Sequence, residues 1–123
     1  MPDAISDLVA ARGAEIIETR RYFHGIPELG FEENETAQAI AGRLTKAGLE
    51  VETGIGKTGV VGVLKGGKEG PTLMIRADID GLPVDELTGL EFASTNGRMH
   101  ACGHDGHITM AVIAAEILAG IKD

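Results

Sequence analysis

Three of the four histidines and the only cysteine lie within residues 100–107, which makes this segment the densest group of reactive side chains. Cys102 and His104 are separated by one glycine, so both side chains can point to the same side of an extended backbone. A thiolate and an imidazole together suit Zn²⁺ or another borderline transition ion. The spacing alone leaves three interpretations open: a metal site, a structural loop, and a cysteine nucleophile paired with a histidine.

A second group of charged residues, Arg76, Asp78 and Asp80, stands at the end of an apolar run. Ligand sites in α/β sheets lie beyond the carboxyl ends of strands, so these carboxylates are candidates for orienting a metal or moving a proton. Aspartate and glycine are also common in turns, and ordinary turn chemistry remains the alternative interpretation of this segment.

A third region, residues 20–36, contains His24 and a run of acidic residues. A lone histidine near a helix end is more often a capping or solvated residue than a ligand, and we expect this of His24. We expect the four acidic residues between positions 28 and 35 to form a solvated approach to the next helix.

The helices that must position these groups follow from the spacing of apolar residues. This spacing predicts a first amphipathic helix over residues 3–24, which Gly13 interrupts. It predicts a second helix that Asn34 caps and Gly48 closes. A last helix, capped by Asp105, is apolar almost all round and therefore belongs between layers.

Strands are expected between the second and the last helix. Residues 49–51 alternate between apolar and acidic side chains, as in a short half-buried strand. Residues 60–64 and 73–77 are continuous apolar runs joined by a glycine-rich connection, so we expect them to pair as an antiparallel hairpin. The order of elements predicts an α/β layer architecture.

Length and composition exclude several classes of protein. The 123 residues, 43% of them hydrophobic and 24% charged, fit about one globular domain. The net charge of −8 opposes binding to nucleic acid or to an anionic membrane, and no signal peptide or membrane span is readable. A single cysteine excludes an intrachain disulfide framework, so we expect a reducing, cytoplasmic location.

Taken together, residues 21–36, 76–83 and 99–107 resemble the N-terminal part of the M20 metallopeptidase superfamily in order and spacing. The resemblance is to the amidohydrolase branch, which contains hippurate hydrolases and N-acyl-amino-acid amidohydrolases. It implies that residues 1–123 are the N-terminal segment of a zinc-peptidase-like, three-layer α/β catalytic domain, with helices flanking a mixed sheet. The lid and dimerisation domain and the C-terminal half of the catalytic domain would then lie outside this chain.

The same resemblance implies a role for individual residues. Cys102 would bridge two divalent metal ions (Zn, Mn, Co or Ni), His104 would bind one of them, and Asp80 would hold a ligand in orientation. The general-base glutamate is expected beyond Asp123, so no catalytic residue is assigned within the chain.

The reaction implied is hydrolysis of the amide bond of small N-acyl amino acids such as hippurate. The full-length protein is expected to form a homo-oligomer through its lid domain, without nucleic-acid or membrane partners. The alternative is an inactive α/β module that binds metal weakly through Cys102, His104 and either His107 or His100.

Overall fold

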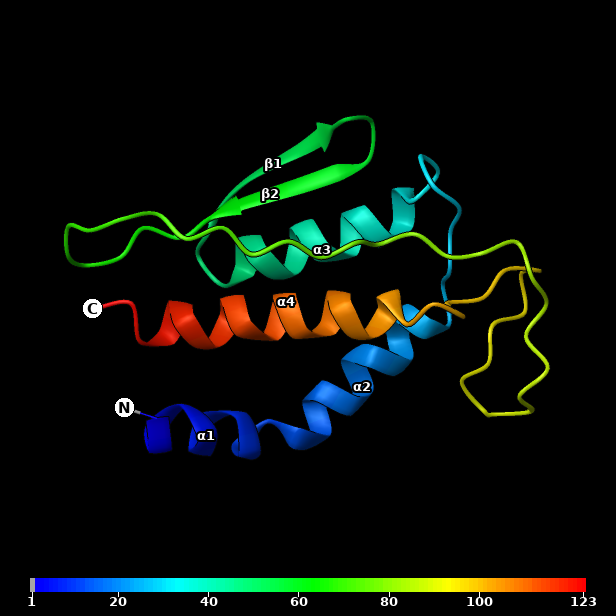
Figure 1. Ribbon diagram of the computed structural model, residues 1–123, viewed down its shortest axis with the longest axis horizontal. Coiled ribbons are helices and arrows are strands. Elements are labelled where there is room, and N and C mark those ends of the chain that lie inside the picture. Colours follow the sequence, from blue (N-terminus) through cyan, green and yellow to red (C-terminus); the bar gives the residue numbers. More distant parts are fainter. Residues whose placement is uncertain (1) are drawn as a thin grey trace.

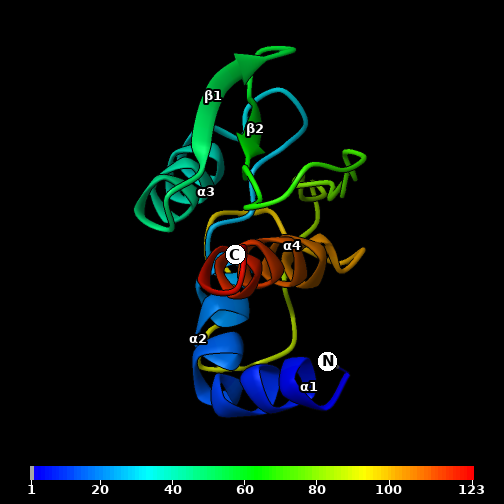
Figure 2. The same ribbon diagram turned by 90° about the vertical axis from the view of Figure 1, so that its left-hand side faces the viewer.

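The computed structural model describes the backbone of residues 2–123 and the side chains of residues 4–123. It contains four helices and one two-stranded antiparallel sheet, which confirms the α/β class. Helix α4 runs between α3 on one side and α2 with α1 on the other, and the β1–β2 hairpin lies beyond α3 (Figure 1). The same stacking is visible along the axis of α4 (Figure 2). The elements are α1 (Pro2–Ala11), α2 (Gly13–His24), α3 (Asn34–Lys46), β1 (Glu50–Ile55), β2 (Gly59–Val63) and α4 (His104–Gly120).

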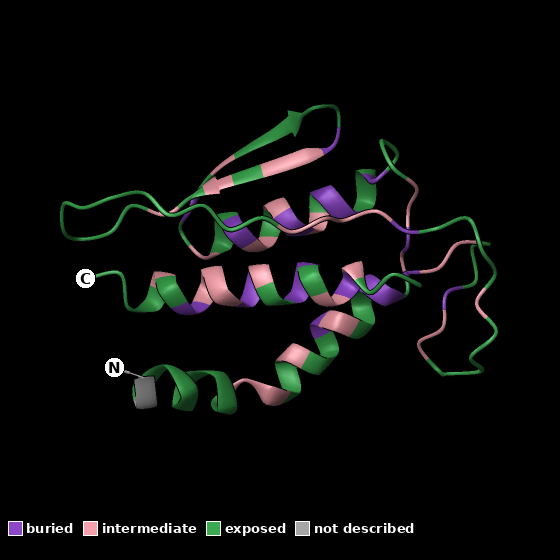
Figure 3. Cartoon of the chain, viewed as in Figure 1, coloured by how far each residue is buried: buried purple, intermediate pink, exposed green. Residues whose placement is uncertain are grey.

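The segment predicted as a helix over residues 3–24 is helical but divided into two helices, because the chain breaks at Arg12, next to the interrupting Gly13. Arg12 has φ −107° and ψ 15°, outside the helical range, and α2 begins at Gly13. Glycine is a poor helix former, so a break here costs little. The Arg12 guanidinium bonds Glu15 at the start of α2 and Glu116 on α4, which fixes the bend between the two helices. Helix α1 is largely exposed (Figure 3).

Helix α3 begins at Asn34, but the prediction that Asn34 caps it is wrong, because Asn34 is its first residue and the capping group comes from elsewhere. The carboxylate of Glu28 accepts hydrogen bonds from two backbone N–H groups of the first turn, at 2.6 and 3.1 Å. Glu33 is buried and accepts a hydrogen bond from the Thr58 hydroxyl at 3.2 Å. The expected solvated approach is therefore wrong for Glu28 and Glu33, whose carboxylates tie this loop to α3 and to the hairpin.

Beyond α3, the left-handed Gly48, with φ +96°, confirms the predicted helix stop. The chain then forms the hairpin of β1 and β2, in which Glu50 pairs with Val63 and Glu52 with Val61. The connecting turn contains Gly56 and Lys57, both at positive φ, as tight hairpin turns require.

The predicted pairing of residues 60–64 with 73–77 is wrong. Residues 71–80 form no strand, and Leu73 and Met74 are 83% and 86% exposed. An apolar run identifies a strand-forming segment but does not identify its partner, and the close turn between β1 and β2 pairs residues 59–63 first.

The buried core joins α2, α3 and α4. Ile108 and Val112 of α4 and Phe23 of α2 are each at most 2% exposed, and the inward face of α3 packs against them. No helix within residues 2–123 has both the length and the apolar composition needed to cross a bilayer. The core cluster consists of Phe23, Ile40, Leu44, Leu49, Ile108 and Val112.

We expect Ile108→Ala to lower the free energy of unfolding by about 2 to 5 kcal/mol, because a side chain 1% exposed leaves a cavity when it is truncated. Met110→Ala is the matched control on the same helix, since Met110 is 64% exposed, and it should cost less than about 0.5 kcal/mol. Urea unfolding followed by circular dichroism measures both. Equal losses would contradict the assignment of Ile108 to the core.

Candidate metal centre

The first turn of α4 is set by a glycine rather than by a capping side chain. Gly103, immediately before the helix, has φ +87°, a left-handed conformation that glycine adopts without strain. Its carbonyl accepts hydrogen bonds from the backbone N–H groups of Gly106 and His107, at 3.0 and 3.3 Å. The prediction that Asp105 caps the helix is wrong: Asp105 lies inside the first turn, and its carboxylate points into the protein, where it is 2% exposed.

His104 and His107 share one face of α4 because they are three residues apart. Their rings stack with centroids 5.4 Å apart. The carboxylate of Asp78 reaches both rings, 2.6 Å from Nδ1 of His107 and 3.3 Å from Nε2 of His104. One ligand atom from each of the three residues lies within 4.8 Å of the other two. This is a nitrogen and oxygen donor set of the kind that a borderline divalent ion accepts.

Asp80 contacts the other side of the His104 ring. Nδ1 of His104 lies 2.9 Å from the Asp80 carbonyl and 3.0 Å from its carboxylate. Since both partners are acceptors, Nδ1–H donates to them, and Nε2 faces the carboxylate of Asp78. A histidine ligand is commonly oriented in this way by a carboxylate or carbonyl on its second nitrogen.

Ionisation of Asp78 is favoured where it stands. The hydrogen bond from His107 is the largest cause that lowers the pKa of Asp78, and the nearby His104 adds to it against a smaller opposing effect of burial. Asp78 is therefore an anionic ligand candidate placed between two imidazoles.

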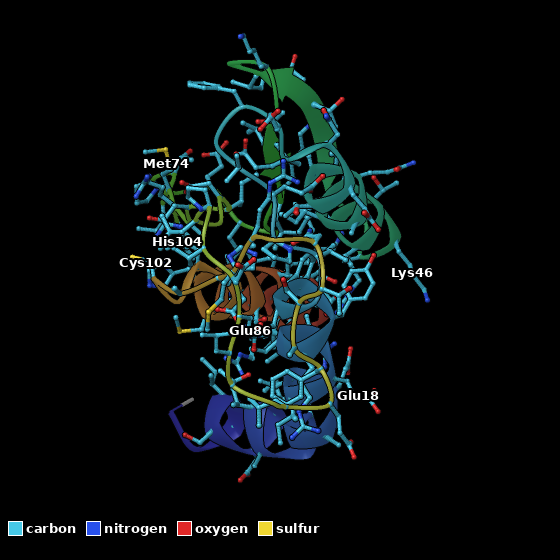
Figure 4. All side chains as sticks on the ribbon, turned by 90° about the vertical axis from the view of Figure 1, so that its right-hand side faces the viewer. Glu18, Lys46, Met74, Glu86, Cys102 and His104 are labelled. Carbon is cyan, nitrogen blue, oxygen red and sulfur yellow. The ribbon has the colours of Figure 1, made fainter. Side chains whose placement is uncertain are left out.

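Cys102 and His100 lie in the loop that leads to this cluster. Cys102 is exposed and lies on the same edge of the molecule as His104 (Figure 4). It is not among the three residues whose ligand atoms group together, so its role as a metal ligand stays a prediction. His100 is 4% exposed, its two ring nitrogens have no hydrogen-bond partner in the described part of the chain, and burial lowers its pKa.

A buried set of charges lies behind the first turn of α4. His24 is 2% exposed, and its Nδ1 lies 2.8 Å from the carboxylate of Asp105, which also accepts a hydrogen bond from Arg20 Nε at 2.7 Å. Its Nε2 lies 2.9 Å from the carboxylate of Glu86, whose side chain is fully buried. The expectation that His24 caps a helix or is solvated is wrong, because it joins two buried carboxylates.

Glu86 is held in its ionised form by its neighbours. Burial alone would raise its pKa, but hydrogen bonds from the Thr88 hydroxyl, the Ser94 backbone N–H and His24 outweigh burial and lower the pKa of Glu86 to about 2. Glu86 is thus a buried anion at neutral pH.

Sequence reasoning anticipated part of this arrangement. It selected His104 and Asp80, which lie in contact, and Cys102, which lies outside the group. It missed the pairing of Asp78 with His107, although the three-residue spacing of the two histidines on a predicted helix was a readable signal. The roles of Glu86 and Asp105 carried no local signal, because their partner His24 is more than 60 residues away in sequence from each.

Comparison with known proteins gives a family for this geometry. Residues 74–123, which include the whole cluster, match the model of "Peptidase family M20/M25/M40". Over these residues the chain is similar to the M20 peptidase family. The named relatives are longer proteins. The chain is similar to their N-terminal part and spans about a third or less of their length.

Among M20 relatives, thermostable carboxypeptidase 1 of Saccharolobus solfataricus is 49% identical over 88% of this chain and 28% of its own length. Hippurate hydrolase of Campylobacter jejuni is 49% identical over 85% of this chain and 28% of its own length. The crystal structure of Bacillus subtilis YxeP, described as a dinuclear metal-binding peptidase of the M20 family, superposes with a TM-score of 0.85 at 42% identity. It covers 92% of this chain, which in turn covers 32% of YxeP.

The buried Glu86 should make stability depend on acid pH. Because the folded protein lowers the pKa of Glu86 from 4.5 to about 2, this stabilisation is complete above pH 4.5 and is lost as the pH falls toward 2. Glu86→Gln should be less stable than the wild type at neutral pH but show a shallower loss of stability over that interval. Urea unfolding at a series of pH values measures this, with the exposed Glu91→Gln as the control. Parallel profiles for wild type and Glu86→Gln would contradict it.

Proposed function

We propose that this chain contributes part of a dinuclear metal centre to an amidohydrolase that cleaves the amide bond of small N-acyl amino acids, hippurate-like substrates included. The observation that carries the proposal is the convergence of Asp78, His104 and His107 at the start of α4, within the segment that matches the M20 family. The names of the relatives, among them an N-acyl-L-amino acid amidohydrolase of Geobacillus stearothermophilus that is 42% identical, support the class of reaction.

The side chains at this position fit a divalent ion. His104 presents Nε2 with Nδ1 already engaged by Asp80, and Asp78 supplies an ionised carboxylate beside it. We propose that Cys102 and His104 would hold a pair of divalent ions (Zn, Mn, Co or Ni), with Asp80 as the residue that orients His104. A site loaded in this way would supply a Lewis acid for the carbonyl of the amide that is to be cleaved.

Proton transfer calls for a carboxylate that is free to accept and release a proton. Glu116, the one glutamate of α4, does not fit, because Arg12 and Arg43 bond its carboxylate at 2.7 to 2.9 Å. These bonds outweigh its burial and lower the pKa of Glu116. In line with the resemblance to the M20 family, we propose that the general-base glutamate lies beyond Asp123, in the part of the longer relatives that this chain does not span.

Other features of the longer protein are proposed on the same basis. A small-molecule substrate is consistent with the names of the relatives, and the net charge of −8 disfavours nucleic acid or anionic membranes as partners. Homo-oligomerisation through a lid domain and a cytoplasmic location stay predictions.

A second candidate is an inactive α/β module with weak metal binding. It is favoured by the solvent exposure of Leu73 and Met74. The two candidates differ in whether this segment supports catalysis once the remaining two thirds of an M20 protein are supplied.

Metal titration tests the ligand assignment. We expect Co²⁺ to bind this chain and His104→Ala and Cys102→Ala each to weaken binding by about tenfold or more, with His107→Ala costing less. Affinity should fall as the pH is lowered, because protons compete with the metal for imidazole and thiolate. Absorption spectroscopy and calorimetry measure this. A larger loss for His107→Ala than for Cys102→Ala would instead make Asp78, His104 and His107 the ligands.

Activity assays test whether this chain needs the rest of a longer relative for catalysis. This 123-residue chain should not hydrolyse hippurate or acetylated amino acids with added Zn²⁺, Mn²⁺, Co²⁺ or Ni²⁺, because a catalytic acid or base alone contributes about 10²- to 10⁴-fold of the rate. A chimera that places this chain in the matching segment of the Campylobacter jejuni hippurate hydrolase should hydrolyse hippurate and lose that activity with Cys102→Ala. Turnover by the chain alone would overturn the first expectation, and a folded but inactive chimera the second.

A further inference from the structure

In the first turn of α4, the two histidines and Asp105 project from different sides of the helix. At about 100° per residue, His104 and His107 lie about 60° apart around the helix axis. Asp105 lies about 100° from one and about 160° from the other, so it points to the interior when they point to Asp78. Among the described residues no side chain caps this helix, and Gly103 before it has no side chain that could restrict rotation of the turn. The contacts of Asp105 therefore add, at the first turn itself, to the apolar contacts that Ile108 and Val112 make further along the helix.

Asp105 is held by a chain of charged groups that spans three segments. Arg20 and His24 of α2 both contact its Oδ2, at 2.7 and 2.8 Å. The second ring nitrogen of His24 contacts Glu86 at 2.9 Å. Glu86 belongs to the loop of residues 78–100, whose base is closed by the antiparallel bridge between Leu82 and Met99.

That loop also carries the partners of the α4 histidines. Asp78 and Asp80 stand at its start, immediately before the bridge, and contact His104 and His107 on the outer side of the helix. His24 thus connects the inner side of α4 to the same loop whose beginning provides the outer contacts.

His24 stands between two buried carboxylates, with one ring nitrogen 2.8 Å from Asp105 and the other 2.9 Å from Glu86. Arg20 contacts the same Asp105 oxygen. Removing one partner of a buried, hydrogen-bonded charge set leaves an uncompensated charge, which the protein relieves by moving the groups toward water. Motion of Asp105 would rotate His104 and His107 with it.

We propose that His24 is a positioning residue for the metal centre: through Asp105 and Glu86 it fixes the rotation of the first turn of α4, so that His104 and His107 face Asp78. Its effect on metal binding rests on the function proposed above, whereas the orientation of the two rings can be measured in the metal-free chain. His24 touches neither metal nor substrate.

The test compares His24→Gln and Glu86→Gln with Glu116→Gln in this chain. A glutamine at position 24 can donate to one carboxylate but turns its own oxygen toward the other. Glu116→Gln removes an arginine-bonded carboxylate from the same helix, about 16 Å along the axis from Asp105, and controls for a general loss of stability. The readouts are the imidazole ¹H–¹⁵N signals of His104 and His107 without metal, and the affinity and absorption spectrum of Co²⁺.

We expect His24→Gln and Glu86→Gln, shown to be folded by circular dichroism, to shift the ring signals of His104 and His107 and to weaken Co²⁺ binding about 10- to 100-fold, with an altered spectrum. Glu116→Gln should leave ring signals, affinity and spectrum unchanged. Folded His24→Gln with wild-type ring signals would overturn the proposal, as would equal changes in Glu116→Gln.

Two further outcomes keep the inference separate from the proposed function. If the wild type binds no Co²⁺, the metal centre of this chain fails, and the metal-free ring signals alone decide the role of His24. If His24→Gln does not fold, Glu86→Gln decides in the same way.

Discussion

Burial of ionised groups is the constraint on which the rest of this structure depends. Asp105 and Glu86 are carboxylates with almost no solvent contact, and a carboxylate in that position is tolerated only when donors surround it. His24 and Arg20 provide those donors from α2. Meeting this requirement brings the end of α2, the start of α4 and the loop after residue 78 to one place, and the apolar contacts of Phe23 and Ile108 close around it.

The helices were readable from the sequence because their determinants are local. Gly48 ends α3 through its own backbone conformation, and the apolar spacing of α4 placed it inside the fold. The break at Arg12 was harder to predict from the sequence, because a contact that stabilises it is made to Glu116, 104 residues away in sequence. The pairing of strands was not readable, since residues 60–64 and 73–77 look alike and only the turn near Gly56 decides which segment finds a partner.

The candidate site, too, could be predicted from the sequence only where its signals are local. The cysteine and histidine separated by one glycine stand out within a few residues, and so does an aspartate pair at the end of an apolar run. The hydrogen bond between these two motifs pairs Asp78 with His107, which are 29 residues apart in sequence, so it forms only when the chain folds. The prediction for His24 was wrong for a related reason: its neighbours in sequence do not indicate that its two partners lie in other segments. The same motifs nevertheless sufficed to reveal the resemblance to the M20 family, because their order and spacing span most of the chain.

The exposed run at Leu73 and Met74 has a consequence for how this chain behaves among its own copies. An extended, apolar stretch with exposed side chains is a template for pairing between molecules, and proteins restrain such stretches with charged gatekeepers on either side. Here Lys68 and Glu69 precede the run, Pro71 interrupts its approach, and Asp78 follows it. The carboxylate that contacts the two α4 histidines is therefore also one of the charges that flank this run, so a neutral replacement of Asp78 would remove a histidine contact and a flanking charge at once.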